Sequence, residues 1–451
     1  MDNFVIFFVF YTMMLVVFGG MQYVVFQLYK RWFTYSFETE RAQKTCLRIG
    51  YGVLFVGNLL FWPRFVIAYT YLHDSAFLQK FMVYPGGLYF AIIFLLFVFS
   101  TLIYAGRGIQ HVMNYFKFAF GKTKPGNSSE QAQMAAGQSP ELQPEPVPVP
   151  VSENVTSPEP TGISRRSFIR TAGAAAFGAP LLLTTGLSAA THRNYVISKN
   201  TLYFPNLPTG LEGLRLVHIS DIHSGIFMNK RQIQEIYEII NSLNPNLVAI
   251  TGDLVDTHIT EIPNIRDTIS MLKTDYGVFG CPGNHDHYAS ADALMDALAD
   301  KPVSMLQNAH RELRINGEKL TMIGIDDAGE VGRDFADIEK AVRGSDPESF
   351  RILLSHRPHM FDDARAKDIS LTLAGHTHGG QIGFNIAGLE LYPIDWFHPY
   401  SRGHYTKEDR HLYVNVGVGL VGAPIRLVRP EITELTFTSN PALAGSVVMN
   451  A

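Results

Sequence analysis

Cysteine is nearly absent from this chain, with 2 residues among 451. Two thiols are too few for a disulfide framework, and we expect Cys46 and Cys281 to remain reduced and unrelated. An excess of positive charge is also missing, because the formal net charge is −4. The sequence therefore offers no electrostatic basis for binding a nucleic-acid polymer.

Charge is nearly absent from three long stretches near the N-terminus, residues 4–27, 49–72 and 82–105. Each is long enough to cross a hydrocarbon core, which takes about 20 helical residues. The second stretch is the least regular, since Pro63 and Arg64 interrupt it. We predict that residues 1–121 form a membrane region with three transmembrane helices.

Basic residues in the connecting segments orient this region. Five lie between the first two stretches, only Lys80 lies between the second and third, and four follow the third. The positive-inside rule places the first loop and the segment after the third stretch in the cytoplasm. The two larger groups are Lys30, Arg31, Arg41, Lys44 and Arg48, and then Arg107, Lys117, Lys122 and Lys124.

Residues 122–163 are rich in Pro, Ser, Gln and Glu and are predicted to be a linker. Arg165 and Arg166 then precede an uncharged Ala, Gly and Leu stretch, so residues 164–192 resemble a twin-arginine export signal. A fourth transmembrane helix fits the same charges. Both interpretations carry the chain outward, so we expect the following domain to face the periplasm or the cell exterior, with the export machinery as a partner in the first case.

Residues 193–438 alternate short apolar runs with amphipathic segments, which indicates an α/β domain. The clearest helix covers residues 229–243, where apolar residues recur at helical spacing before Asn244-Pro245. Further helices are expected at 289–298 and 335–342, and strands at 411–416 and 432–437. Residues 439–451 are predicted to be a frayed, disordered tail.

Five apolar, strand-like runs end in residues that commonly bind metals. The runs are 214–220, 247–251, 278–281, 351–354 and 369–374. The polar loop after a buried strand delivers its side chains to one rim of a sheet, so five such loops can converge on one point. Their carboxylate, imidazole and amide groups suit Mn, Fe or Zn. The delivered residues are Asp221, His223, Asp253, Asn284, His285, His356, His376 and His378.

The order D-x-H, G-D, G-N-H-D, H, G-H-x-H resembles the calcineurin-like metallophosphoesterases, and its extended ending resembles their membrane-associated, twin-arginine branch. The resemblance implies a four-layer α-β-β-α sandwich behind the membrane region. It also implies two divalent ions. Asp221, His223 and His378 would hold the first ion, Asn284, His356 and His376 would hold the second, and Asp253 would bridge them with one oxygen each.

The same resemblance assigns His285 to the phosphoryl group as general acid or charge stabiliser, without a metal. A hydroxide bridging the two ions would attack phosphorus. His287 and Arg357, together with Asn284, are weaker candidates for substrate contacts. Two alternatives stay open: His287 is a histidine in a surface turn, and Arg357 forms a salt bridge on the surface. An aromatic-rich stretch at 382–405 is expected to form ordinary core and loop, a wall beside the metals, or a contact with the bilayer.

These observations predict a membrane-bound, dimetal phosphohydrolase, most simply a phosphodiesterase. Its substrate would be a membrane- or envelope-linked phosphoester or pyrophosphate, which includes lipid-linked substrates. Two alternatives stay open at this point. The first is a nucleotide phosphodiesterase or phosphomonoesterase. The second is a membrane sensor whose metal domain binds phosphate ligands without catalysis.

Overall fold

The computed structural model describes residues 2–37, 39–63, 194–329, 334–386, 389–422 and 426–450, with runs of one to three residues between 85 and 113 and single positions between 167 and 178. The predicted linker at 122–163 and residues 64–72 of the second apolar stretch lie outside these residues, as does nearly all of 164–192.

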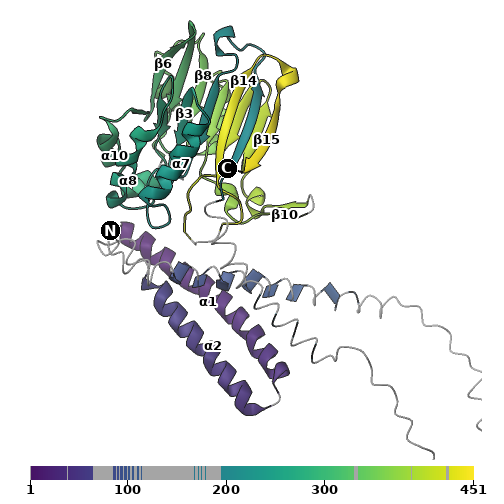
Figure 1. The fold of residues 1–451 in the computed structure, drawn as a ribbon. Coiled ribbons are helices and arrows are strands. Elements are labelled where there is room, and N and C mark those ends of the chain that lie inside the picture. Colours follow the sequence, from purple (N-terminus) through teal and green to yellow (C-terminus); the bar gives the residue numbers. More distant parts are fainter. Residues whose placement is uncertain are drawn as a thin grey trace, which may run out of the picture. The chain divides into compact units, whose positions relative to one another are not determined.

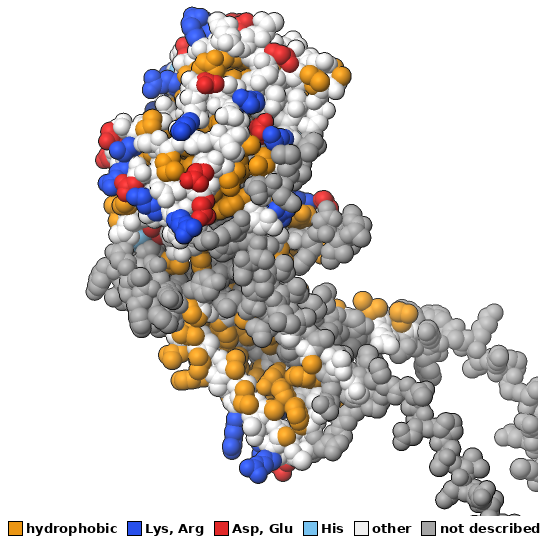
Figure 2. Space-filling view, viewed as in Figure 1, with side chains coloured by type: hydrophobic (Ala, Val, Ile, Leu, Met, Phe, Trp, Pro, Cys, Tyr) orange, Lys and Arg blue, Asp and Glu red, His pale blue; other side chains and the backbone are white. Residues whose placement is uncertain are grey.

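The N-terminal part contains two long helices, α1 (Asp2–Ser36) and α2 (Glu40–Phe61). Thr12–Ser36 within α1 is the one stretch of the described residues that is long and apolar enough to cross a membrane, with a mean hydropathy of 1.4. Hydrophobic side chains cover much of these helices, and Lys and Arg gather at one end (Figure 2). The three-helix membrane region stays a prediction beyond this helix.

Two mixed sheets form the centre of the domain (Figure 1). The first sheet has the strand order β15-β1-β14-β2-β3-β4-β5, and the second has the order β12-β13-β9-β8-β7-β6. In the first sheet β2 (Arg215–Ile219), β3 (Leu247–Thr251) and β4 (Val278–Cys281) are parallel. In the second, β8 (Phe350–Leu354) and β9 (Leu371–Ala374) are parallel. All five strands predicted to precede metal-binding residues are confirmed.

The remaining strands complete the two sheets. In the first sheet they are β1 (Val196–Tyr203), β5 (Val303–Met305), β14 (Glu431–Thr438) and β15 (Gly445–Asn450). In the second they are β6 (Ala309–Ile315), β7 (Glu318–Gly324), β12 (Gly403–Lys407) and β13 (Arg410–Val414). A separate hairpin pairs β10 (Phe384–Ile386) with β11 (Leu389–Leu391).

Helices cover the outer face of each sheet. On the first lie α7 (Lys230–Ser242), α8 (Ile262–Thr268) and α10 (Ala291–Leu298), and on the second lie α11 (Ile338–Val342) and α12 (Phe361–Arg365). α9 (Asn284–Ala289) precedes α10, and Ser290 separates them with a φ of 135°. The predicted helix at 289–298 is confirmed as α10, which begins at Ala291, and the one at 335–342 begins at Ile338.

Three hydrophobic clusters show the four layers directly. In β3, Val248 and Ile250 pack towards the helices, whereas Leu247 and Ala249 pack between the sheets. This alternation follows from the two-residue period of a strand. A third cluster, including Ile323, Leu353 and Ala364, joins the second sheet to its helices. The predicted four-layer α-β-β-α sandwich is confirmed.

The C-terminus differs from the prediction of a frayed tail. Residues Gly445–Asn450 form β15, which pairs antiparallel with β1 from Thr201↔Gly445 to Val196↔Asn450. Without β15, β1 would present its unpaired backbone groups at the sheet edge. The tail sequence shows no strong strand pattern, and its order comes from this tertiary pairing.

Candidate metal centre

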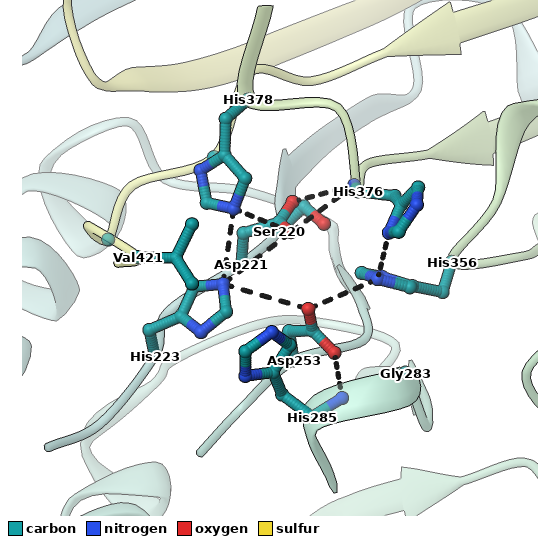
Figure 3. A network of polar contacts seen from close by, with 12 residues as sticks. Ser220, Asp221, His223, Asp253, Gly283, His285, His356, His376, His378 and Val421 are labelled. Atoms are coloured by element: carbon teal, nitrogen blue, oxygen red, sulfur yellow. Dashed lines mark hydrogen bonds and ion pairs between the residues drawn. The ribbon is translucent and has the colours of Figure 1, made fainter. Parts of the chain in front are cut away.

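The metal-binding residues predicted from the sequence meet at the carboxyl ends of five parallel strands (Figure 3). Loops after β2, β3 and β4 supply residues from the first sheet, and loops after β8 and β9 supply residues from the second. Because the strands of each set are parallel, their ends meet at one rim of the sandwich. Side chains that lie up to 157 positions apart in the sequence therefore come together in one site.

The turns that carry these residues are unusual in backbone geometry. Asp221, His223, Asp253, His376 and His378 all have positive φ, between 47° and 72°. Residues other than glycine rarely adopt this backbone region, and those that do are concentrated at functional sites. The turns direct these polar side chains towards one another. The strained backbone conformation is therefore what positions them at the centre.

Two glycines permit the close packing of these turns. A Cβ on Gly283 would lie 2.3 Å from Asp253 Oδ1. A Cβ on Gly375 would lie 1.8 Å from Ser220 Oγ and 2.4 Å from Asp221 Oδ2. Any side chain at either position would push a carboxylate out of the centre.

The first group of donors is Asp221, His223 and His378. His223 Nε2 lies 3.1 Å from His378 Nε2, and His378 Nε2 lies 3.3 Å from Asp221 Oδ1. All three side chains are buried. Their ligand atoms lie within 4.8 Å of one another, a spacing that can hold one ion.

The second group is Asn284, His356 and His376. His356 Nε2 lies 3.1 Å from Asn284 Oδ1 and 3.2 Å from His376 Nδ1. His356 Nδ1 donates to the carbonyl oxygen of Thr251 at 2.9 Å, which leaves Nε2 as the nitrogen that faces the other donors. A backbone carbonyl that fixes one ring nitrogen is typical of metal-binding histidines.

Asp253 connects the two groups. Its Oδ2 lies 3.6 Å from His223 Nε2 and 3.2 Å from His356 Nε2. Its Oδ1 accepts the backbone N–H of His285 at 2.8 Å. A single oxygen therefore faces both groups, where the family resemblance implied one oxygen for each.

Electrostatics at this position favour a cation. Burial lowers the pKa of His356, but the Asp253 carboxylate outweighs burial and raises that pKa to about 10. Burial, with His356 and Arg357 nearby, lowers the pKa of His376 to about 3, and burial also lowers the pKa of His378. Neutral imidazoles and ionised carboxylates are the forms that bind metals. The Asp253 carboxylate that holds a proton on His356 would attract a metal ion in its place, so the donor set fits two divalent ions.

His285 lies beside the bridging carboxylate, and its ring meets that of His223 edge to face at 4.6 Å. Its Nδ1 contacts the backbone oxygen of Asp256 and lies 3.4 Å from Asp256 Oδ1. Burial lowers the pKa of His285, but Asp253 and Asp256 raise it to about 9. The two carboxylates therefore favour a proton on His285, and Nδ1 is the nitrogen that faces Asp256.

The two weaker substrate candidates have firm protein partners. Arg357 Nε donates to Asp327 Oδ1 at 2.8 Å, and its Nη1 lies 3.3 Å from His376 Nε2. His287 Nε2 lies 2.6 Å from Asp326 Oδ1, and its ring stacks on Phe335 at 4.3 Å. Arg357 therefore borders the second donor group, while His287 is held by its neighbours.

Two residues at this centre were missed in the sequence. Asp256 Oδ1 lies 3.2 Å from His223 Nδ1, and Arg426 is fully buried behind Asp221. Arg426 Nη2 donates to the carbonyl oxygens of Val416 at 2.5 Å and of Gly417 at 2.8 Å. Asp256 could have been found as a second carboxylate three residues after Asp253, but no local pattern marks Arg426.

Comparisons with known proteins agree with this geometry. Residues 214–380 match the family model of the calcineurin-like phosphoesterases. A transmembrane protein with a metallophosphoesterase domain from Danio rerio is 34% identical over 243 residues, which cover 51% of this chain and 54% of that protein. An uncharacterised metallophosphoesterase of Bacillus subtilis is 29% identical over 293 residues, which cover 61% of this chain and 98% of that protein.

A solved structure of a dimetal phosphatase from Danio rerio covers 46% of this chain and 88% of that chain, at 11% identity and a TM-score of 0.31. The chain spans about half the length of the first two curated relatives that it matches. The apolar helix and the transmembrane relatives together indicate a membrane protein. Residues 214–380 of this chain form a calcineurin-like phosphoesterase domain.

Proposed function

We propose that this protein is a phosphoric ester hydrolase that depends on two divalent metal ions. The observation that carries the proposal is the position of Asp253 Oδ2 between His223 Nε2 and His356 Nε2. One carboxylate oxygen shared by two nitrogen-rich donor groups suits a pair of ions. When bound, such ions supply Lewis acidity and a water of lowered pKa.

The protein's own residues complete the chemistry. His285 is placed to donate a proton to the leaving oxygen, since its Nδ1 is tied to Asp256 and its pKa is raised. Asp327 and Asp253 hold Arg357 and the backbone of His285 in place. The centre thus provides one proton donor and one guanidinium that is already paired. This modest side-chain charge favours a singly charged phosphodiester over a doubly charged phosphomonoester.

We further propose that the substrate is linked to the membrane or envelope, and that the domain faces the periplasm or cell exterior. The basic residues at the turn between α1 and α2 support this orientation through the positive-inside rule. Glu40→Cys and Asp300→Cys, each in a Cys46→Ala background, test it with a membrane-impermeant maleimide. Both side chains are exposed. We expect Asp300→Cys to react in intact cells and Glu40→Cys only after permeabilisation, and the reverse pattern would refute the orientation.

Hydrolysis is tested with the full-length chain, stripped of metal and reloaded with Mn²⁺. We expect two ions per chain by elemental analysis and turnover of an aryl phosphodiester. His285→Gln should keep both ions and lose about 10²–10⁴-fold in kcat, the range of general acid catalysis. His404→Gln, on β12 and outside the centre, is the matched control. A wild-type chain that binds two ions but cleaves neither phosphodiesters nor monoesters would be a sensor instead.

A further inference from the structure

The segment Leu391–Pro399, here called the aromatic loop, presents large apolar side chains to its surroundings. Trp396 is 73% exposed and Phe397 is 77% exposed, and Leu391 adds a third exposed side chain. Trp396 and Phe397 are the most exposed large hydrophobic residues that the structure describes. They are consecutive residues on and just after a short 3₁₀ helix, η8 (Pro393–Trp396), and this exposed pair is here called the tip.

The aromatic loop is fastened to the metal centre. Thr377, which lies between two metal-binding histidines, donates from Oγ1 to the carbonyl oxygen of Ser401 at 2.5 Å. Ser401 Oγ in turn donates to Asp395 Oδ1 at 2.6 Å. Ile394 also packs so closely on Gly380 that a Cβ there would lie 2.9 Å from Ile394 Cβ. The base of the tip is therefore tied to the turn that carries His376 and His378.

Arg402 holds the loop from its other side. Its guanidinium carbon lies 3.4 Å from the centroid of the Tyr392 ring, and its Nη1 donates to Asp395 Oδ1 at 2.5 Å. Polar partners thus anchor Tyr392 and Asp395, whereas the structure describes no such partner for the exposed side chains of Trp396 and Phe397. A tip that is well anchored yet exposes two aromatic rings indicates a contact outside this domain.

The chain enters the domain beside this loop. Val196, the first residue of β1, lines the same cavity of about 830 Å³ as Tyr392 and His398. The uncharged apolar stretch at 171–191 ends five residues before Val196. Five residues span at most about 17 Å. If that stretch remains as a helix in the membrane, the bilayer surface is within reach of this edge.

We propose that Trp396 and Phe397 insert into the interface of the lipid bilayer and hold the metal centre against it. Two such rings expose roughly 300 Å², well below the roughly 800 Å² that each partner contributes to a stable protein interface. A bilayer needs no such complementary area, and tryptophan is the residue enriched at its interface. Thr12–Ser36 of the same chain is long and apolar enough to cross such a bilayer.

This contact gives the proposed function a substrate class, and that part of the inference rests on the proposed hydrolase activity. A phosphoester whose head group projects from the bilayer surface would reach the rim of the sandwich without leaving the membrane. Binding of the loop to lipid does not depend on catalysis, so the two claims can fail separately.

The first test uses fluorescence of the full-length chain, which has three tryptophans, Trp32, Trp62 and Trp396. Replacing the first two with phenylalanine leaves Trp396 as the only indole emitter. In phosphatidylcholine vesicles we expect lipids brominated near the head of the acyl chain to quench most of its emission, and acrylamide to quench little. Quenching by acrylamide alone, or by neither agent, would overturn the proposal. Retained Mn²⁺ binding shows that this variant is folded.

The second test compares two substrates. The double variant Trp396→Asp/Phe397→Asp should lose most turnover of a phosphodiester lipid in vesicles and keep turnover of a soluble aryl phosphodiester. Leu443→Asp is the matched control, because Leu443 is 59% exposed and lies on η9 (Pro441–Leu443), just after β14. β14 runs antiparallel to β2, so its carboxyl end lies at the end of the sheet opposite to the metal centre. Equal loss on both substrates would overturn the proposal. No hydrolysis by the wild-type chain would refute the hydrolase activity alone, since the fluorescence result would stand.

Discussion

His223 Nδ1 lies 3.2 Å from Asp256 Oδ1, so a carboxylate that binds no metal in the predicted set orients one of the metal-binding imidazoles. The same carboxylate lies 3.4 Å from His285 Nδ1. Asp256 therefore acts on two functions at once, because it positions a ligand of the first ion and stabilises the charge of the proposed proton donor.

Asp256→Asn is expected to weaken metal binding by about 10- to 100-fold, the usual effect of removing a carboxylate behind a metal-binding histidine. It should also lower the pKa of His285, which Asp253 and Asp256 together hold at about 9. Because His285 must be protonated to act as an acid, the basic limb of the pH profile of kcat/KM should move to lower pH. Metal titration and a pH profile measure the two effects, and Asp292→Asn on α10 is the control. An unchanged basic limb would exclude the role of Asp256.

Arg426→Met is expected to destabilise the domain strongly. The guanidinium donates to the carbonyl oxygens of Val416, Gly417 and Val428, and it contacts that of Gly419. Leaving these buried acceptors without a donor should cost about 4 kcal/mol or more of unfolding free energy. Because Gly419 N–H also donates to the Asp221 carbonyl oxygen at 2.8 Å, metal binding should weaken as well.

The control for this change is Arg429→Met, three residues further along. Arg429 bonds to Asn194 and Tyr195 nearer the surface, and its loss should cost less than about 1 kcal/mol. Thermal unfolding of both variants in detergent, followed with and without Mn²⁺, measures the difference. Equal midpoints for the two variants would contradict the assigned role of Arg426.

Metal removal is expected to lower the thermal midpoint of the domain. The donor atoms of His223 and His378 lie 3.1 Å apart, and those of His356 and His376 lie 3.2 Å apart. Bound ions at 100 times their dissociation constant would contribute about 2.7 kcal/mol per site. For a domain of this size, each kcal/mol shifts the midpoint by about 2–4 °C. Chelated and Mn²⁺-loaded samples should therefore differ clearly, and Asp253→Asn should reduce that difference. A midpoint that is independent of Mn²⁺ would argue against the centre.

A buried histidine away from the ions should make stability depend on pH. His218 on β2 is fully buried, its Nε2 lies 2.8 Å from Thr251 Oγ1, and burial lowers its pKa to about 3. The unfolded chain takes up a proton near pH 6.5, whereas the folded domain does not, so stability is complete above pH 6.5 and falls as the pH drops towards 3. At pH 5 the loss from this group is about 2 kcal/mol.

His218→Gln cannot take up that proton and serves as the comparison. Between pH 7 and pH 5 the wild-type midpoint should fall by about 5 °C more than that of the variant. Thermal unfolding at both values, with chelator present to remove metal effects, provides the measurement. Parallel decreases in the two proteins would show that His218 contributes nothing to the acid sensitivity.

The sequence predicted which residues come together at this centre, because its signals are local. His356, for example, follows the wholly buried strand β8, and an apolar run that ends in a polar loop marks both the strand and the residue that it delivers. Gly375 and Gly283 could be recognised as turn positions, but the contacts with Ser220 and Asp253 that require them join distant loops. The break at Ser290, with a φ of 135°, likewise has no signal in the apolar pattern around it.

The sequence alone determined which strands form, which side chains follow them and which chemistry those side chains can support, because strand periodicity and ligand type are properties of short segments. The tertiary structure alone decided that one oxygen of Asp253 faces both donor groups, that Asp256 and Arg426 support them, and that the C-terminal residues pair with β1. These relationships depend on distances between segments far apart in the chain, and packing of the two sheets sets those distances.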